Sequence, residues 1–387
     1  MLKKGREYIS PRWGRCHSAA SRYGNRILRQ ALPNARRPML SSAPRCRVSR
    51  SVRVTESGSG SSPQPEQLLC LLEQLADGEP RPVAHLAAGV GVLPGAVEAW
   101  LPLLVDHGVR QRQDGTLRIP GGLALLDAER IEAAVANGPR PVGVTVLGVT
   151  GSTNDVARKA VEAGRGSPFV VFAEAQTAGR GRRGRGWASP VASNLYLSHV
   201  EPLPGGLEGA RGLSLVAGVA AAEAIEAATG VTVALKWPND LLVGRRKLGG
   251  ILVELVMAAG RCHAVVGVGL NVRVPAYVGA GIDQAWTDLT QASKTAVDRN
   301  VLAAAMVGQL ARELEAFRIG GFDVALRARW EARDPYRDQR VVAQSEGGAL
   351  RGWARGIDEE GALLIEAAEG MVTVGAGDVS LRSEEHD

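Results

Sequence analysis

The sequence predicts an α+β protein with three folded parts: a small helical domain, a larger domain built on a mixed sheet, and a short β domain. Three patterns support this prediction. Apolar residues repeat at helical spacing from Glu66 onward, strand-like and helical segments alternate from Val142 onward, and residues 339–382 consist of short strand-like runs between turns. With 387 residues and 45% hydrophobic content, the chain has room for two or three domains with real cores.

The first 65 residues differ from the rest of the chain in charge. Residues 1–60 hold 14 of the 46 Lys and Arg but two of the 40 acidic residues, which leaves residues 61–387 with 32 basic and 38 acidic residues, a net charge of −6. The overall charge of +6 therefore does not indicate that the folded part binds nucleic acid. Residues 1–54 fit a mitochondrial transit peptide, a disordered tail, or upstream sequence translated from a wrongly chosen start codon. Residues 55–65 are typical of a flexible linker, so we treat 1–65 as a basic extension and linker.

Residues 66–127 are predicted to form a winged helix-turn-helix domain. Leu68, Leu71, Leu72 and Leu75 lie on one face of a first helix. Further helices are expected at 83–88 and 96–105, and an Asp-Gly pair at 114–115 predicts a hairpin after them. Three helices and a hairpin are the elements of a winged domain.

The third helical segment, LPGAVEAWLPLL, would be the recognition helix, and its composition argues against operator DNA. It contains Glu98 and no Lys or Arg, and Pro102 interrupts its interior. A helix that reads the major groove needs hydrogen-bond donors for bases and cations for phosphates. Arg110, Arg112 and Arg118 in the hairpin are the remaining candidates for DNA contacts.

Residues 128–335 are predicted to form a mixed sheet with helices on one face. After a short helix at 128–137, strands are expected at 142–149, 169–174, 193–200, 233–237, 241–243, 249–256 and 263–272, and helices at 153–163, 211–229, 298–317 and 322–329. Residues 336–387 are predicted to form a small β-barrel, because short strands alternate there with turns at 346–348 and 358–361.

Several functional classes are disfavoured by residue usage. Cys16, Cys46, Cys70 and Cys262 are scattered, which suits a reducing cytoplasm and gives no metal-ligand spacing. Six dispersed histidines offer no zinc cluster, and the chain has neither a Walker A loop nor a Ser-His-Asp set. No run of about 18 to 20 apolar residues predicts a membrane span. We expect a soluble protein whose catalysis uses position and charge.

The Arg–Gly loop, residues 175–190, is the feature around which the expected chemistry is arranged. Its sequence AQTAGRGRRGRGWASP holds four glycines and four arginines. Glycine backbone brings N–H groups close to an anion and Arg adds charge-assisted bonds, so a phosphate-bearing ligand is one interpretation. A solvated, disordered basic segment is the other. Strand-like runs beginning at Phe169 and Ser193 on either side favour a loop held by a packed domain.

Three further polar clusters flank predicted strands. GSTND at 151–155 fits either a helix N-cap or a ligand-binding segment. KWPND at 236–240 places a cation, an aromatic ring, an amide and a carboxylate within five residues, which a simple turn does not require. RRKLGG at 245–250 is either a solvated hairpin tip or a turn whose Lys247 points back into a site. The carboxylate of Asp240 is available for Mg²⁺.

The motifs GSTND, QTAGRGRRGRGW, KWPNDLL, KLGGILVEL and GVGLNV occur in the order and at about the spacing of the biotin protein ligases. Over residues 66–383 the chain resembles the longer, bifunctional members of this family, which are also biotin operon repressors. The resemblance implies a class II synthetase-like central domain and an SH3-like C-terminal barrel. It also implies that biotin and MgATP form biotinyl-5′-AMP and pyrophosphate, and that a lysine of the biotin carboxyl carrier protein domain of acetyl-CoA carboxylase then attacks the adenylate.

The resemblance assigns roles to individual residues. The residues that match the biotin-binding positions are Ser152, Thr153, Asn154, Gln176, Lys247 and the backbone of Gly179 and Arg180. Those that match positions around ATP and the adenylate are Arg182, Arg183, Arg185, Trp187, Asn239 and Asn271. The catalytic set implied in this way is Lys247, Arg182, Arg185 and Lys236, with Asp240 as the candidate Mg²⁺ ligand.

Two alternative functions remain open. A lipoate protein ligase shares the fold and the adenylate chemistry, although the intact Arg–Gly loop and KLGGILVEL favour biotin. The second alternative is a catalytically inactive, ligand-sensing transcriptional regulator. The predicted recognition helix, however, lacks the Lys and Arg residues that such a regulator would use to contact DNA. The resemblance further implies a bacterial cytoplasmic protein that forms a homodimer and has no membrane partner, and a winged domain argues against a mitochondrial address.

Overall fold

The structure is a computed structural model that describes residues 62–206, 208–345, 348–375 and 380–383. The three interpretations of residues 1–54 and the linker expected up to residue 61 lie outside the described residues. Of the segments expected after residue 65, part of the turn at 346–348 and residues 376–379 and 384–387 of the predicted β domain also lie outside the described residues.

The first described elements are four short helices and a two-stranded hairpin. Their core contains the predicted leucines, and Leu71, Leu72 and Leu75 are fully buried. The segment predicted as one recognition helix is broken at Trp100, because the proline at position 102 cannot continue a helix that began at residue 94. The elements are α1 (Pro65–Gln74), α2 (Val83–Val90), α3 (Pro94–Ala99), α4 (Leu101–Asp106), β1 (Arg110–Gln111) and β2 (Leu117–Arg118).

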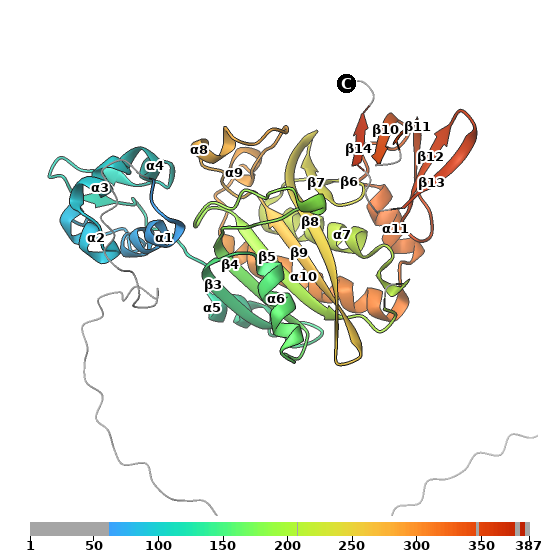
Figure 1. Cartoon of the computed structure of the whole chain (residues 1–387), viewed down its shortest axis with the longest axis horizontal. Helices are drawn as coiled ribbons and strands as arrows, with labels where there is room; N and C mark the ends of the chain where they lie inside the picture. The colour runs from blue at the N-terminus through green and yellow to red at the C-terminus, as the bar shows by residue number, and fades with distance from the viewer. Residues whose placement is uncertain (1–61, 207, 346–347, 376–379, 384–387) are drawn as a thin grey trace, which may run out of the picture. The chain divides into compact units, whose positions relative to one another are not determined.

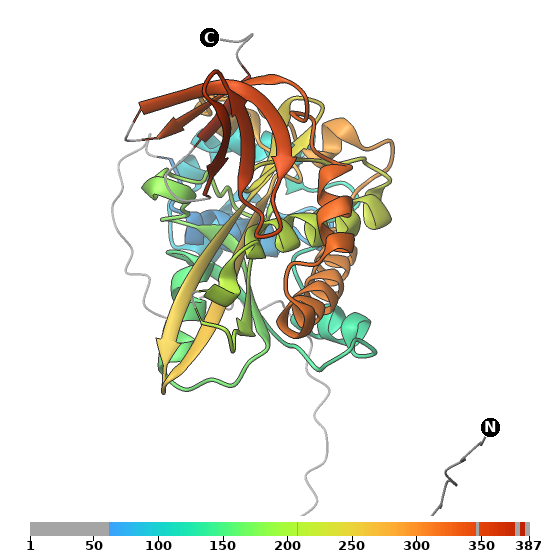
Figure 2. The same ribbon diagram turned by 90° about the vertical axis from the view of Figure 1, so that its right-hand side faces the viewer.

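The central part is a seven-stranded mixed sheet in the order β3-β4-β5-β9-β8-β7-β6. β3 and β4 are parallel, and every other neighbouring pair is antiparallel. Figure 2 shows the long β8–β9 hairpin extending past its neighbours. The strands are β3 (Gly143–Thr150), β4 (Phe169–Gln176), β5 (Leu195–Pro202), β6 (Ala234–Lys236), β7 (Asp240–Val243), β8 (Arg246–Ala258) and β9 (Arg261–Leu270).

Helices cover both faces of this sheet (Figure 1), so the expectation of helices on one face is wrong. Val170 and Phe172 of β4 belong to the core with α7 and α10, whereas Phe169 and Val171 belong to the core with α6. Successive side chains of a strand point to opposite faces, so an unbroken apolar run such as Phe169–Ala173 requires cover on both sides. The helices are α5 (Ala128–Val135), α6 (Thr153–Glu162), α7 (Leu213–Thr229), α8 (Ala276–Gly279), α9 (Leu289–Ala292) and α10 (Arg299–Gly320).

The helix α7 is the apolar centre of this domain. The stretch Glu208–Thr229 is long and apolar enough to cross a membrane by length and composition. Eleven residues of α7 are nevertheless buried within the protein, packed into the core with the sheet and α10. A core helix of this kind needs no lipid to cover its apolar surface.

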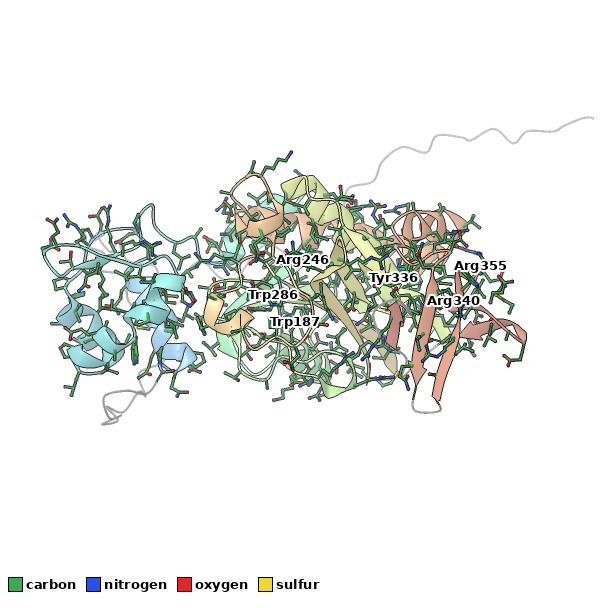
Figure 3. The ribbon with its side chains drawn as sticks, turned by 90° about the horizontal axis from the view of Figure 1, so that it is seen from above. Trp187, Arg246, Trp286, Tyr336, Arg340 and Arg355 are labelled. Carbon is green, nitrogen blue, oxygen red and sulfur yellow. The ribbon has the colours of Figure 1, made fainter. Side chains whose placement is uncertain are left out.

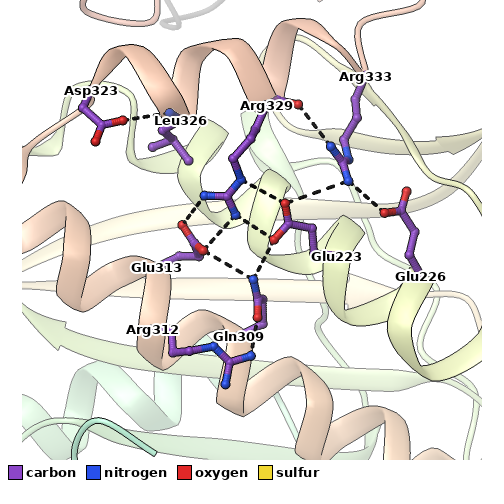
Figure 4. A network of polar contacts seen from close by, with 9 residues as sticks. All are labelled: Glu223, Glu226, Gln309, Arg312, Glu313, Asp323, Leu326, Arg329 and Arg333. Carbon is purple, nitrogen blue, oxygen red and sulfur yellow. Dashed lines mark hydrogen bonds and ion pairs between the residues drawn. The ribbon is translucent and has the colours of Figure 1, made fainter.

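The chain ends in α11 (Val324–Glu331) and a five-stranded antiparallel sheet, which provides the β-rich C-terminal part that was expected. Arg329 of α11 bonds to Glu223 of α7 and Glu313 of α10 in the network of Figure 4. Trp237 at the end of β6 donates from Nε1 to the Gly361 carbonyl at 3.1 Å. The strands, in the order β13-β12-β11-β10-β14, are β10 (Arg340–Ser345), β11 (Gly348–Ile357), β12 (Leu363–Ala367), β13 (Gly370–Val374) and β14 (Ser380–Ser383).

Candidate active site

A cavity of about 910 Å³ lies where the four sequence clusters meet. It is lined by the Arg–Gly loop, the start of α6, the turn between β6 and β7, strands β8 and β9, residues 281–286 and β14. All of the predicted site residues line it except Gly179 and Arg183. Segments that are more than 80 residues apart in sequence are therefore brought together at one site.

One part of the cavity is lined by uncharged hydrogen-bonding groups. The Gln176 Oε1 atom accepts from the backbone N of Thr153 at 2.9 Å and from its hydroxyl at 3.2 Å, and Gln176 Nε2 donates to Ser189 Oγ at 3.0 Å. The Ser198 hydroxyl lies 2.8 Å from Thr153 Oγ1 and 2.6 Å from Asn154 Oδ1. Such a set of donors and acceptors suits a neutral polar ligand that must be paired when it is buried.

The GSTND segment, residues 151–155, does not cap α6 through its serine side chain. Ser152 occupies the N-cap position of α6, yet its side chain makes no capping bond. The first-turn N–H of Thr153 is satisfied by Gln176 of β4 instead. Ser152 and Thr153 are each 4% exposed, so both hydroxyls are enclosed at the cavity wall rather than in solvent. The polar-ligand interpretation of GSTND is favoured over the capping one.

Glycines form the floor of the cavity. A Cβ atom on Gly269 would lie 2.6 Å from the Cε2 and Nε1 atoms of Trp187, and one on Gly267 would collide with the amide of Asn154. A Cβ on Gly250 would lie 3.6 Å from the same indole. At position 269 of β9 only glycine leaves room for the Trp187 ring, whereas the contact at position 250 of β8 is an ordinary van der Waals distance.

The Arg–Gly loop is a tight hairpin. Gly181 N donates to the Arg185 carbonyl at 2.8 Å, and Trp187 N donates to the Gly179 carbonyl at 2.9 Å. The tip is a short 3-10 turn, η1 (Arg182–Gly184), in which residues 183 and 184 have φ of 59° and 66°. Positive φ explains the glycine at the tip, and the hydrogen-bonded stem differs from the disordered basic segment considered above.

A second part of the cavity is cationic. Lys247 Nζ lies 2.7 Å from Asp240 Oδ1 and 5.6 Å from the ring centre of Trp187, so Lys247 points inward and the solvated-tip interpretation is wrong for it. Burial lowers the pKa of Lys236, Asp240 opposes this effect, and neighbouring cations add to it. The cations around this part are Arg182, Arg185, Lys236, Lys247 and Arg382.

Three predicted residues have side chains engaged elsewhere. The guanidinium of Arg180 makes two bonds, of 2.7 and 2.8 Å, to Asp155 of α6. Asn271 Nδ2 donates to the carbonyl of Thr287 at 3.1 Å, which holds the segment that follows residues 281–286. Arg183 lies outside the cavity lining, with one guanidinium nitrogen 3.5 Å from a β10 carbonyl. Only the backbone of residue 180 was expected to meet the ligand, and that expectation remains a prediction.

Two contributions to the cavity were missed in the sequence. Arg382 of β14 lines it from the end of the chain, where no motif marks the residue. Residues 281–286 line it because two backbone bonds hold this segment against Lys247. The Lys247 N–H donates to the Ala285 carbonyl at 2.9 Å, and the Lys247 carbonyl accepts from the Thr287 N–H at 2.9 Å. Trp286 and Trp187, both labelled in Figure 3, line the cavity, and a tryptophan in an irregular segment was the one available signal.

Comparisons with known proteins identify the family to which the chain is similar. The family described as Biotin/lipoate A/B protein ligase matches residues 146–271, and the Biotin protein ligase C terminal domain matches residues 338–382. The bifunctional ligase/repressor BirA of Salmonella typhimurium is 38% identical over 325 residues, covering 82% of this chain and 98% of that protein. A biotin–[acetyl-CoA-carboxylase] ligase of Mycobacterium tuberculosis is 37% identical over 244 residues, 60% of this chain and 87% of that protein.

Among solved structures, a biotin protein ligase from Aquifex aeolicus in complex with biotin and ATP superposes with a TM-score of 0.52 at 27% identity. It covers 62% of this chain, and 99% of that chain is matched. The Salmonella relative is matched over nearly its whole length at an identity that does not arise by chance. The chain belongs to the biotin protein ligase family, within its group of bifunctional ligase/repressors.

Proposed function

We propose that this chain catalyses the ATP-dependent attachment of biotin to a lysine of a biotin carboxyl carrier protein domain. The observation that supports this most is the cavity itself, in which a neutral hydrogen-bonding part and a cationic part are joined over a glycine floor beneath the Arg–Gly loop. Biotin needs the first and a triphosphate needs the second. Relatives are named as biotin–[acetyl-CoA-carboxylase] ligases, and the Aquifex structure was solved with biotin and ATP.

In the first half-reaction, a biotin carboxylate oxygen attacks the α-phosphorus of ATP, and the bond to pyrophosphate breaks. Thr153 and Gln176 would pair with the ureido ring, whose two N–H groups and one carbonyl all need partners once water is excluded. Arg182, Arg185 and Lys236 would offset the charge that develops on the phosphates. Trp187, lying against Gly269, would pack on the adenylate.

Mg²⁺ enters this scheme with ATP as part of the substrate. Among the described residues, no group of three or more His, Cys, Asp or Glu is placed to hold a metal ion. Asp240 Oδ1 already pairs with Lys247 at 2.7 Å. Mg²⁺ that arrives with ATP needs only one or two protein carboxylates beside the phosphates, so Asp240 stays our candidate ligand for it and also orients Lys247.

In the second half-reaction, the neutral amine of the acceptor lysine attacks the acyl carbon of biotinyl-5′-AMP. A C–N bond forms, the C–O bond to AMP breaks, and the amine loses a proton. Lys247, held inward by Asp240, would stabilise the negative charge on the acyl oxygen during attack. The Arg–Gly loop would exclude water, which would otherwise hydrolyse the mixed anhydride.

The test is to incubate the chain with ATP, a biotin carrier domain and either labelled biotin or labelled lipoate. Transfer of biotin to the carrier is expected, and transfer of lipoate alone would identify a lipoate ligase instead. The variant Arg182→Gly, with one loop cation removed, is expected to release the adenylate faster and to label lysines indiscriminately. Unchanged adenylate retention would count against the proposed role of the loop.

The remaining expectations extend this proposal. We assign residues 66–127 to a winged helix-turn-helix, 128–335 to the catalytic domain and 336–387 to an SH3-like barrel, in a homodimer of the bacterial cytoplasm. Operator binding is a second function, supported by relatives that are named ligase/repressors. It is opposed by the composition of α3 and α4, which hold no Lys or Arg. A gel shift with the chain's own biotin operon, with and without biotinyl-5′-AMP, tests it.

A further inference from the structure

An ion pair at the base of the Arg–Gly loop has no part in the proposed reaction. Arg180 Nη1 lies 2.7 Å from Asp155 Oδ2 and Nη2 lies 2.8 Å from Asp155 Oδ1, which is the two-bond arrangement of a guanidinium and a carboxylate. Glu254 Oε1 lies 3.7 Å from the same Arg180 Nη2. The hydrogen bonds from Arg180 are the largest cause of a lowered pKa at Asp155, so this carboxylate stays charged at neutral pH.

The position of Arg180 in the loop makes this pair informative. Residues 180 and 186 face each other as a β-bridge in the stem of the hairpin. The stem bond from Trp187 N to the Gly179 carbonyl, at 2.9 Å, follows immediately. Fixing Arg180 therefore fixes the backbone that places Trp187 over the cavity floor.

The two carboxylates belong to elements that line the cavity themselves. Asp155 lies in the first turn of α6, directly after Ser152, Thr153 and Asn154. Glu254 lies on β8 and accepts from Asn154 Nδ2 at 2.7 Å. Asp155 and Glu254 thus connect the loop stem to the start of α6 and to the middle of β8. Neither of these two side chains lines the cavity.

We propose that Asp155 and Glu254 are positioning residues that hold the stem of the Arg–Gly loop over the cavity through Arg180, so that the activated biotin is retained until the acceptor lysine arrives. This inference rests on the proposed function. Asp155 supplies the stronger tie, since both of its oxygens bond to Arg180, and Glu254 the weaker one. Neither residue is expected to touch the reacting atoms.

The experiment follows the escape of adenylate from the full chain. The chain is loaded with labelled biotin and MgATP, freed of excess ligand, and mixed with Nα-acetyl-lysine as a small acceptor. Because the pair is about a third exposed, Asp155→Asn is expected to speed adenylate release about three- to tenfold and to raise small-amine labelling in proportion. Glu254→Gln is expected to give a smaller increase, of about twofold.

Matched controls separate positioning from general damage. Glu162→Gln breaks the exposed Arg158–Glu162 pair on the same helix and is expected to retain adenylate like the parent chain. Asp155→Glu, which keeps the carboxylate, is expected to recover most of the retention. Thermal unfolding of Asp155→Asn is expected within a few degrees of the parent, whereas a merely structural role would lower it in parallel with activity.

Three results would overturn the inference in different ways. If the parent chain formed no biotinyl-5′-AMP, both the proposed function and the inference would fall. If the parent formed it and both Asp155→Asn and Glu254→Gln retained it with the parent half-life, the positioning role alone would fall. An additive effect of Arg180→Gln and Asp155→Asn in the double variant would also count against it, because partners in one contact are non-additive.

Discussion

At the scale of single residues, the floor of the cavity depends on Gly269. An added Cβ would lie 2.6 Å from the Trp187 ring, so the indole would have to move. Overpacking typically costs about 1 to 3 kcal/mol, and we expect Gly269→Ala to slow adenylate formation about tenfold or more. Gly166→Ala, where nothing lies within 4 Å of the added atom, is the control and should leave the rate unchanged. A parent-like rate in Gly269→Ala would contradict the placement of Trp187.

The charge of Lys236 provides a second residue-scale prediction. Burial is the largest cause of its lowered pKa, Asp240 raises it, and Lys247, Arg382 and Arg185 lower it further. Lys236 therefore loses its proton at a lower pH than a free lysine, whose pKa is 10.5. We expect the KM for ATP to rise on the alkaline side as this cation is neutralised, and Lys236→Arg to abolish that rise because a guanidinium stays charged. The measurement is KM for ATP against pH in both chains.

At the scale of elements, α11 depends on the network of Figure 4. Arg329 bonds to both Glu223 and Glu313, at distances of 2.6 to 3.0 Å. Replacing it with Met removes the cation of Glu313 and leaves Glu223 with the 3.9 Å contact to Arg333 as its one ion pair among the described residues, and we expect a loss of about 1 to 2 kcal/mol in the free energy of unfolding. Urea unfolding should show a lower midpoint at an unchanged slope. Arg158→Met, which removes the exposed pair with Glu162 and a 3.7 Å contact with Asp155, should cost less than about 0.5 kcal/mol.

The sequence predicted the type and order of the seven central strands and of helices α5, α6, α7 and α10, but it missed the short helices α8 and α9, which are too short to show a local period. The prediction was wrong where tertiary packing decides which helix covers a face of the sheet. The run from Phe169 to Ala173 shows that β4 is buried, but the helix that covers each face is set by topology, and α6 lies on the face that was expected to be bare. The break at Trp100 was visible beforehand in Pro102, because a missing N–H acts locally.

At the scale of the whole molecule, the site was predictable only in its motif-bearing parts. The clusters at Ser152, Gln176, Lys236 and Lys247 contain residue types that chemistry demands, so they stood out before the fold was known. Arg382 of β14 lines the same cavity. The sequence around this single arginine does not indicate where the residue lies in the fold. Long-range pairing of this kind follows from tertiary packing, which single-sequence periodicity does not contain.

The proposed operator binding depends on where the cations of the N-terminal helices and hairpin lie. Within the described N-terminal helices and hairpin, α3 and α4 present no cation, whereas the hairpin carries Arg110, Arg112 and Arg118. Each phosphate contact contributes about −0.9 to the slope of log K against log salt. The variant with all three arginines replaced by Gln should therefore make that negative slope shallower by about 2 to 3, and should weaken binding to operator and scrambled DNA alike. A triple variant that kept the parent slope and operator affinity would place the DNA contact on another surface, and Arg158→Gln is the control for charge lost elsewhere.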